Sequence, residues 1–542
     1  MQAIQKYELW LQKAKDNNVQ KQLQSMTDEQ ISSAFFKDLE FGTAGMRGIV
    51  GAGSNCMNIY TVGKVTEAVA RYLDKKPNAK IAVSYDSRNM SKEFSNIIAE
   101  ICALHNIKVY LADKMMPTPF LSYMVRYYGC DLGVMITASH NPKEYNGYKL
   151  YDSNGCQLLD EPSKEIMAIA EQVDMFNIDT MPLDVAVDKG LVEYIGNDVL
   201  ESYFAEVEKR SYNRIDNLTI VYTALNGTGV NTLPELIKRR GANIILNEVQ
   251  CKEDKDFTTC PYPNPEKQEV FVPSYKLAID NNADLIIATD PDSDRVGVEV
   301  RVGESFRHFT GNEIGALLTD YVLSESGAKG YIVRSIVSTT LADKVAQKHG
   351  AKIKTVLTGF KYIGDFIRSL EDEGREKEFL LAFEESYGYL SGSYIRDKDA
   401  TLASMLICEM ASKAKQQGKT LVDKIEELYS EFGLYEHVVK SYKFAGAQGD
   451  KKMKDILKGL HLKYFEYIAG SKVVSVLDYQ NGVEDLPCAD VIEYKLDNGG
   501  SVVVRPSGTE PLIKVYVTFT KDKESNSKNF NQTFEFLEKV FE

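Results

Sequence analysis

The stretch DLGVMITASHNPKEYNGYK, residues 131–149, joins an apolar segment to a long polar loop. Its first seven residues have the pattern of a buried β-strand. Two other stretches repeat this order, because ADLIIAT (283–289) leads into DPDSDR and FLLAF (379–383) leads into EESYGY. Open parallel sheets bind ligands beyond the carboxyl ends of their strands. Three polar loops at three equivalent strand ends therefore predict one cleft shared by three domains.

The segments around these strands predict the fold class. Apolar strands alternate with amphipathic helices in three sets, over 80–137, 218–289 and 331–383. Such alternation indicates parallel sheets built from right-handed crossovers. The last hundred or so residues differ, because SVVVRPSGTEPLIKVYVTF (501–519) has the pattern of two strands joined by a tight turn. We expect an α/β protein in which three similar domains with mainly parallel mixed sheets precede a smaller α+β domain. The predicted domains are 1–190, 191–307, 308–435 and 436–542.

Composition excludes several classes of function. The chain has 64 basic and 78 acidic residues, a net charge of −14, which argues against a general nucleic-acid or anionic-membrane binder. No apolar run approaches the roughly 18 residues that cross a membrane. The eight cysteines form no C-x-x-C pair, and the N-terminus has no signal-peptide core. We therefore expect a reduced, cytoplasmic protein without a zinc site.

Three carboxylates follow the strand that ends at residue 289. Asp290, Asp292 and Asp294 would repel one another unless a cation compensates them, which favours a hard divalent ion with oxygen ligands. The loop is no EF-hand, because Arg295 stands where that loop needs glycine and Arg301 where it needs glutamate. The alternative is a solvated acidic turn. The buried strand before the loop favours a metal, and a phosphate ligand would favour Mg²⁺.

Ser139 is a candidate nucleophile, because it follows directly on the predicted strand at 131–137. It lacks the G-x-S-x-G elbow of a hydrolase. Taken alone, a serine in this position is more often a turn or capping residue, and a lone His140 is more often structural. The case for chemistry at Ser139 therefore depends on its combination with the other loops.

Four further loops carry groups suited to phosphates and sugars. RPSGTEP, which begins at Arg505, offers a guanidinium, two hydroxyls and free backbone N–H groups to a phosphate, although it could be an ordinary hairpin turn. Glu384 and Ser386 in FEESYGY could bind sugar hydroxyls, or form a surface turn. GTAGMRG brings Arg47 to a glycine-rich loop, and Lys398 lies near the start of a predicted helix, where anions are favoured.

Five motifs together resemble those of the α-D-phosphohexomutases. GTAGMRG, TASHNP, DPDSDR, FEESYG and RPSGTEP occur in this order and at these separations in that family. The resemblance runs from about Leu39 to the end of the chain. AGMRG, FEESYGY and TGFKYIG (358–364) are most similar to the phosphoglucomutase branch that includes phosphopentomutase-like members. The resemblance implies four domains around a deep central cleft, three of them sharing an α/β core.

The resemblance also implies roles for individual residues. Ser139 would carry a phosphoryl group as phosphoserine, and Mg²⁺ would be bound by that phosphate and by Asp290, Asp292 and Asp294. Glu384 and Ser386 would hold sugar hydroxyls, helped by Thr358 and Gly359. The phosphate that does not react would be anchored by Arg505, Ser507, Gly508, Thr509 and Lys398. The remaining matches line the reaction centre, and these are Arg47, His140, Lys149 and Arg295.

The resemblance implies a phosphoglucomutase that interconverts glucose 1-phosphate and glucose 6-phosphate through a glucose 1,6-bisphosphate intermediate. A phosphomannomutase or phosphopentomutase of the same mechanism is the alternative. A catalytically silent sugar-phosphate-binding protein and a phosphatase are the alternatives from other classes. The sugar loop departs from the G-E-x-S-G-H form of many relatives, because Gly388 stands where that form ends in histidine. We expect small sugar phosphates as ligands, no nucleic-acid or membrane partner, and a monomer or weak homodimer.

Overall fold

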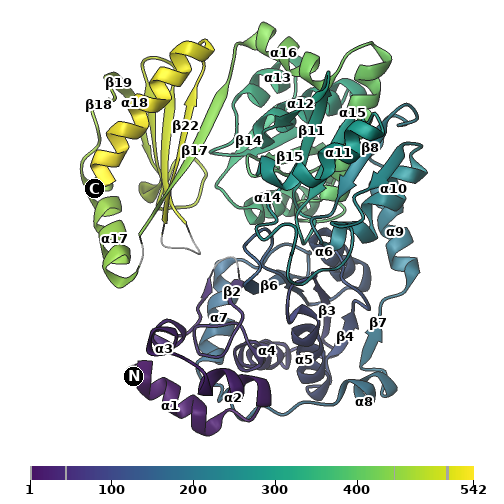
Figure 1. Cartoon of the computed structure of the whole chain (residues 1–542), viewed down its shortest axis with the longest axis vertical. Coiled ribbons are helices and arrows are strands. Elements are labelled where there is room, and N and C mark those ends of the chain that lie inside the picture. The colour runs from purple at the N-terminus through teal and green to yellow at the C-terminus, as the bar shows by residue number, and fades with distance from the viewer. Residues whose placement is uncertain (1–2, 43–44, 445, 508–511, 542) are drawn as a thin grey trace.

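The computed structural model describes residues 3–42, 45–444, 446–507 and 512–541 (Figure 1). Gly508 and Thr509, two predicted phosphate contacts, lie outside the described residues. Within these ranges, no helix combines the length and the apolar character needed to cross a membrane. The predicted fold class is confirmed, because three mixed α/β sheets precede a smaller domain with an antiparallel sheet.

The first domain contains a seven-stranded sheet with the order β1-β2-β6-β5-β3-β4-β7. Its strands are β1 (Phe41–Gly42), β2 (Gly45–Ile49), β3 (Lys80–Tyr85), β4 (Lys108–Leu111), β5 (Leu132–Ile136), β6 (Tyr145–Asp152) and β7 (Val192–Tyr194). β3 is parallel to β4 and β5, whereas β6 is antiparallel to both β5 and β2. β7 pairs with β4, so this sheet extends past the predicted boundary at residue 190.

Some helices of the first domain precede this sheet in the chain, and the others lie between its strands in sequence. Three N-terminal helices come first: α1 (Ala3–Lys13), α2 (Asn17–Gln24) and α3 (Asp28–Phe35). The helices that follow are α4 (Ile59–Leu73), α5 (Ser91–Leu104), α6 (Thr118–Tyr128), α7 (Asp160–Ala170) and α8 (Leu183–Asp188). Trp10 and Phe35 of the N-terminal helices pack edge to face, and Trp10 also contacts Tyr60 of α4. The N-terminal helices are therefore part of the first domain.

The second domain has a five-stranded sheet and the third a four-stranded sheet, in the orders β12-β11-β10-β8-β9 and β14-β13-β15-β16. The strands of the second sheet are β8 (Thr219–Thr223), β9 (Asn243–Leu246), β10 (Leu285–Thr289), β11 (Val296–Val302) and β12 (Ser305–Phe309). Those of the third are β13 (Tyr331–Ser335), β14 (Lys352–Val356), β15 (Phe379–Glu384) and β16 (Gly388–Leu390). Their helices are α9 (Asn197–Glu208), α10 (Leu233–Arg239), α11 (Val272–Asp280), α12 (Gly311–Ser326), α13 (Leu341–His349), α14 (Phe360–Asp372), α15 (Ala400–Gln416) and α16 (Leu421–Phe432).

The three α/β sheets share one local arrangement. In each, a buried strand with a parallel neighbour on one side has an antiparallel neighbour on the other, namely β5 with β6, β10 with β11 and β15 with β16. The polar loops found in the sequence connect these antiparallel pairs. Val134, Ile287 and Ala382, one from each buried strand, belong to a single apolar core. The three loops are thus set at corresponding ends of three connected sheets.

The C-terminal domain has its own apolar core and a six-stranded antiparallel sheet in the order β17-β22-β21-β20-β19-β18. Its strands are β17 (Glu436–Lys443), β18 (Tyr467–Ile468), β19 (Ser471–Asp478), β20 (Ile492–Leu496), β21 (Ser501–Pro506) and β22 (Leu512–Phe519), and its helices are α17 (Gly446–Leu462) and α18 (Lys523–Phe541). Figure 1 shows this domain beside β14 of the third domain. A small apolar cluster joins the two domains and includes Ile336, Leu357, Val503 and Tyr516.

Candidate active site

The loops after β5 and β10 meet at Ser139. The Ser139 hydroxyl donates a hydrogen bond of 2.7 Å to Oδ2 of Asp290. The N-terminus of α6 joins the same contact, because the Thr118 backbone N–H donates to the carbonyl of Asp292 and the Thr118 hydroxyl donates to the Asp292 carboxylate. Ser139 is only 3% exposed. The structure therefore brings the candidate nucleophile and the acidic loop together across the first two domains.

Ser139 has an unusual backbone conformation. Its φ of +50° lies in the left-handed region, which costs a residue other than glycine on the order of 1–3 kcal/mol. The side-chain oxygen of Thr137 accepts a 2.8 Å hydrogen bond from the Ser139 N–H. Such conformations persist where surrounding contacts hold them, and they are frequent at functional sites.

The three aspartates form a compact group of buried carboxylates. One oxygen from each of Asp290, Asp292 and Asp294 lies within 4.8 Å of the others. Oδ1 of Asp292 and Oδ1 of Asp294 are buried without a hydrogen-bond partner. Burial, together with the two neighbouring carboxylates, raises the pKa of Asp290 well above its usual value. Buried carboxylates with unpartnered oxygens are suited to binding a hard divalent cation.

Two lysines compensate part of this negative charge. Lys149 of β6 donates a 2.8 Å hydrogen bond to Asp292, and Lys398 lies 3.1 Å from Asp294 and 2.8 Å from Asp397. Burial opposes ionisation of Asp292, but the Lys149 ammonium lowers the pKa of Asp292 below its usual value. Lys398 precedes α15, so the third domain also contributes a cation to the group.

Three more predicted residues surround Ser139. His140 Nδ1 lies 3.4 Å from the Ser139 hydroxyl oxygen, and Arg47 of β2 donates a hydrogen bond of 3.1 Å to Asn141 in the same loop. Arg295 pairs with Glu266 at 2.8 Å. Burial lowers the pKa of His140 well below its usual value, and the charges of Arg295 and Arg47 add to this effect. His140 is therefore neutral near pH 7.

The predicted sugar loop lies between β15 and β16. Glu384 is buried and accepts a 2.7 Å hydrogen bond from the backbone N–H of Gly359. The Thr358 hydroxyl is buried without a hydrogen-bond partner, and Ser386 is half-buried in the turn. The structure therefore brings TGF and FEESYG together, as two loops of one domain.

The C-terminal residues Arg505 and Ser507 lie at the end of β21. The Arg505 guanidinium donates a 3.3 Å hydrogen bond to the hydroxyl of Tyr516, and the Ser507 N–H donates to the carbonyl of Leu512. Lys514 of β22 stands directly opposite Arg505, so their side chains share one face of the sheet. Lys514 is not among the residues predicted from the sequence, although the alternation of side chains along the strand could have indicated it.

Glu385 is a second residue that was not predicted from the sequence, and its surroundings shift its pKa. Burial raises the pKa of Glu385 to about 7 and Glu384 adds to the rise, while Arg505 and Lys514 oppose it. The Ser335 hydroxyl donates a 3.2 Å hydrogen bond to the Glu385 carboxylate. The sugar loop and the C-terminal cations are therefore electrostatically linked.

Replacing Glu385 by glutamine should change how stability depends on pH. Between pH 4.5 and about 7 the folded protein holds the Glu385 proton and the unfolded chain does not, so its stability falls as pH rises through this window. Glu385→Gln removes this loss, and we expect it to be about 2 kcal/mol more stable than the parent at pH 8 and equally stable at pH 4.5. Urea unfolding at several pH values measures the difference. The exposed Glu484→Gln serves as control, and a gap independent of pH would contradict the prediction.

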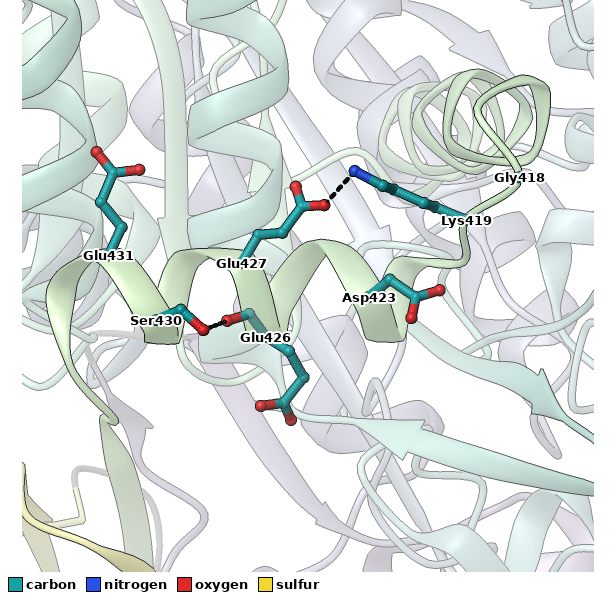
Figure 2. A pocket seen from close by; sticks show the side chains of 7 residues that line it. All are labelled: Gly418, Lys419, Asp423, Glu426, Glu427, Ser430 and Glu431. Atoms are coloured by element: carbon teal, nitrogen blue, oxygen red, sulfur yellow. Dashed lines mark hydrogen bonds and ion pairs between the residues drawn. The ribbon is translucent and has the colours of Figure 1, made fainter.

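A surface pocket of about 620 Å³ lies elsewhere, along α16. Figure 2 shows the acidic side chains that line it, with Lys419 paired to Glu427 at its edge. Its lining residues include none of those described above. This pocket is therefore separate from the group of residues around Ser139.

Four family models match the chain in sequence. All four describe phosphoglucomutase/phosphomannomutase. The alpha/beta/alpha domains I, II and III match residues 38–176, 201–303 and 310–432, and the C-terminal domain matches residues 465–529.

Curated relatives and solved structures agree with these matches. The chain is 38% identical over 531 residues to a phosphoglucomutase of Staphylococcus aureus (strain MRSA252), covering 94% of this chain and 95% of the relative. It is 39% identical over 534 residues to a phosphoglucomutase of Staphylococcus haemolyticus, covering 95% and 96%. Parafusin, a phosphoglucomutase of Paramecium in its open form, shares the fold with a TM-score of 0.70 at 18% identity, over 93% of this chain and 95% of that one. A phosphoglucomutase/phosphomannomutase family protein of Burkholderia thailandensis gives a TM-score of 0.70 at 16% identity, over 92% and 97%.

The order of the domains, the full-length relatives and the shared fold lead to one assignment. The chain belongs to the phosphoglucomutase/phosphomannomutase family of isomerases.

Proposed function

We propose that this enzyme is a phosphoglucomutase, which interconverts glucose 1-phosphate and glucose 6-phosphate through a phosphoserine at Ser139. The observation that carries the proposal is the 2.7 Å contact between the Ser139 hydroxyl and Asp290, inside a buried group of three carboxylates. Relatives that are 38–39% identical over nearly the whole chain are phosphoglucomutases, which supports glucose as the sugar.

The donor set supports Mg²⁺ as the metal. Asp290, Asp292, Asp294 and an oxygen of the phosphoserine would hold the ion. When bound, Mg²⁺ supplies charge neutralisation to the phosphoryl group in transfer. Phosphorylation of Ser139 would place an anion beside three carboxylates, and Lys149 and Lys398 compensate only part of that charge.

The residues around Ser139 are arranged for phosphoryl transfer in both directions. In the first half-reaction the bond between phosphorus and Ser139 Oγ breaks, and a bond to the free sugar hydroxyl forms, giving glucose 1,6-bisphosphate. The hydroxyl proton would pass to a neighbouring base, for which His140 and Lys149 are the candidates. The intermediate then turns end over end and returns its other phosphoryl group to Ser139. Arg47 and Arg295 supply positive charge beside the transfer.

The remaining loops would bind the part of the substrate that does not react. Glu384 and Ser386 would bind sugar hydroxyls, with Thr358 and Gly359 beside them. The C-terminal turn, including Arg505 and the residues up to Thr509, would anchor the second phosphate. A cleft between the domains must hold the sugar in two orientations. Movement of the C-terminal domain would allow the bisphosphate intermediate to reorient.

Intact-mass spectrometry with peptide mapping tests the proposal. Purified protein is incubated with Mg²⁺ and glucose 1,6-bisphosphate, and then with glucose 6-phosphate. We expect a single phosphate on Ser139 that the sugar phosphate removes. A protein that takes up no phosphate under any condition would instead be a silent sugar-phosphate-binding protein, and release of inorganic phosphate in step with turnover would indicate a phosphatase.

Substrate choice needs a separate measurement, because it depends on the orientation of one or two hydroxyls. Comparison of kcat/KM for the 1-phosphates of glucose, mannose and ribose ranks the three. We expect glucose 1-phosphate to be fastest. Faster turnover of the mannose or pentose substrate would replace the proposal by a phosphomannomutase or phosphopentomutase.

A further inference from the structure

A second buried group, the Asp86–Arg88 pair, lies behind the Ser139 loop. Asp86 and Arg88 follow β3, the strand that pairs in parallel with β5. Their exposed fractions are 1% and 3%, and the Arg88 Nε lies 3.3 Å from Oδ2 of Asp86. Burying a charged pair in this way is costly unless further hydrogen bonds satisfy both groups. The further hydrogen bonds of Arg88 therefore show what this buried pair holds in place.

The Arg88 guanidinium binds the backbone of the Ser139 loop at four points. Nη2 donates to the carbonyls of Ser139 and Asn141 at 2.5 and 2.6 Å. Nη1 donates to the carbonyls of Pro142 and Tyr145 at 2.9 and 3.0 Å. One side chain thus fixes the loop from the serine to the start of β6. The planar fork of a guanidinium suits this task, whereas a lysine ammonium carries its three donors on a single nitrogen and cannot reproduce the fork.

Asp86 connects the same group to the Ser139 N–H. Its Oδ2 accepts a 2.6 Å hydrogen bond from the hydroxyl of Thr137, whose oxygen in turn accepts from the Ser139 N–H at 2.8 Å. Its Oδ1 accepts from the Arg88 N–H and from the hydroxyl of Ser91. Both the N–H and the carbonyl of Ser139 are therefore bound, directly or through one hydroxyl, to the Asp86–Arg88 pair.

The second domain covers this group from the other side. The ring of Phe257 lies 5.3 Å from the Arg88 guanidinium, a cation–π distance. In the same segment, the Pro261 carbonyl accepts a 3.2 Å hydrogen bond from the Lys143 N–H. Arg88 is therefore enclosed between the loop that carries Ser139 and the domain that carries the three aspartates.

We propose that Arg88 is a positioning residue for phosphoryl transfer. It holds the Ser139 loop so that the serine keeps its left-handed backbone and directs its hydroxyl to Asp290. Asp86 fixes the orientation of Arg88 and Thr137. This inference rests on the proposed mutase function, in which Ser139 accepts and donates a phosphoryl group in each cycle. A displacement of about 1 Å at a reacting atom can reduce a rate about 10²-fold, so a loosened loop affects the transfer step directly.

The variant Arg88→Lys keeps the positive charge and removes most of the carbonyl contacts. We expect labelling of Ser139 by glucose 1,6-bisphosphate, measured in a single turnover, to slow about 10²-fold. KM for glucose 1-phosphate should stay within about threefold, because Arg88 does not touch the proposed sugar site. Hydrogen exchange of the peptide 138–146 should become faster, since the loop loses its attachment.

Arg301→Lys is the matched control. The Arg301 guanidinium also binds backbone carbonyls, those of Ala278, Ala283 and Gly303, but at the other end of the second sheet from the acidic loop. This variant should lower the melting temperature and leave the labelling rate unchanged. Asp86→Asn is the second test, should Arg88→Lys fold poorly. It should slow labelling in the same direction by about tenfold or more.

The outcomes distinguish failure of the positioning role of Arg88 from failure of the proposed mutase function. If Arg88→Lys is labelled at the parent rate, the positioning role is wrong. It is also wrong if labelling falls only in proportion to the fraction of the protein that is unfolded. If the parent protein takes up no phosphate, the mutase proposal has failed instead. Exchange in the peptide 138–146 then still decides whether Arg88 holds the loop, because that measurement needs no turnover.

Discussion

Ser139→Ala should abolish mutase activity, with a loss of about 10⁴-fold or more, because the change removes the oxygen that carries the phosphoryl group. The fold should be retained, since alanine is smaller than serine and the backbone contacts of the loop do not use the side chain. Loss of one hydrogen bond to Asp290 should cost about 1 kcal/mol. Turnover of glucose 1-phosphate and peptide mapping after incubation with glucose 1,6-bisphosphate measure the effect.

Ser95→Ala provides the control for this experiment. Ser95 is a buried serine of α5 whose hydroxyl donates to the carbonyl of Lys92, in the same domain as Ser139. Its replacement should leave activity and phosphate uptake unchanged. Normal turnover in the Ser139 variant, or phosphate mapped to another residue, would end the phosphoserine mechanism.

Asp290→Asn should lower the activity of the enzyme but raise the stability of the metal-free protein. Activity should fall about 10³-fold, because the change removes a metal ligand and the stabilisation of the transferring group. Without Mg²⁺ the variant should be more stable than the parent by about 1 kcal/mol, since one of three buried like charges is gone. In the parent, the backbone N–H groups of Asp294 and Arg295 donate to Asp290 Oδ1. Asparagine keeps an oxygen that can accept both hydrogen bonds.

Thermal unfolding with and without Mg²⁺ measures both parts of this prediction. The ion should raise the melting temperature of the parent by binding the folded state, and raise that of Asp290→Asn much less. Asp284→Asn is the control, because Asp284 precedes the same strand β10 at its other end and pairs with Lys415. That variant should keep its activity and its response to Mg²⁺. Equal stabilisation of all three proteins by Mg²⁺ would contradict a metal site at the aspartates.

Part of the fold and of the candidate site could be predicted from the sequence because the signals are local. Each polar loop directly follows an apolar strand, so Ser139, Asp290 and Glu384 are marked by their neighbours in the chain. Parallel sheets place such strand ends at one edge, which predicts that the loops approach one another.

The supporting residues could not be predicted in the same way. Arg88 reaches the Ser139 loop only because β3 and β5 are neighbours in the sheet, although α5, β4 and α6 separate them in the chain. Glu266 pairs with Arg295 from a loop that has no strand or helix pattern. Burial and Glu384 raise the pKa of Glu385, and Arg505 and Lys514 of another domain oppose the rise. These features are set by tertiary packing, and no spacing along the chain indicates them.

The hairpin that carries the predicted sugar loop has a consequence for redesigning substrate preference. Glu384 and Gly388 face each other in the pairing of β15 with β16, so the sheet fixes both ends of the predicted sugar loop. The turn between them is packed as well, because Tyr387 is buried and its carbonyl accepts a hydrogen bond from the Val296 N–H, while the Ser338 hydroxyl accepts one from the Glu385 N–H. Ser386 is half-buried in this turn, and substitution at this one position is the route to a new sugar preference that leaves the scaffold unchanged.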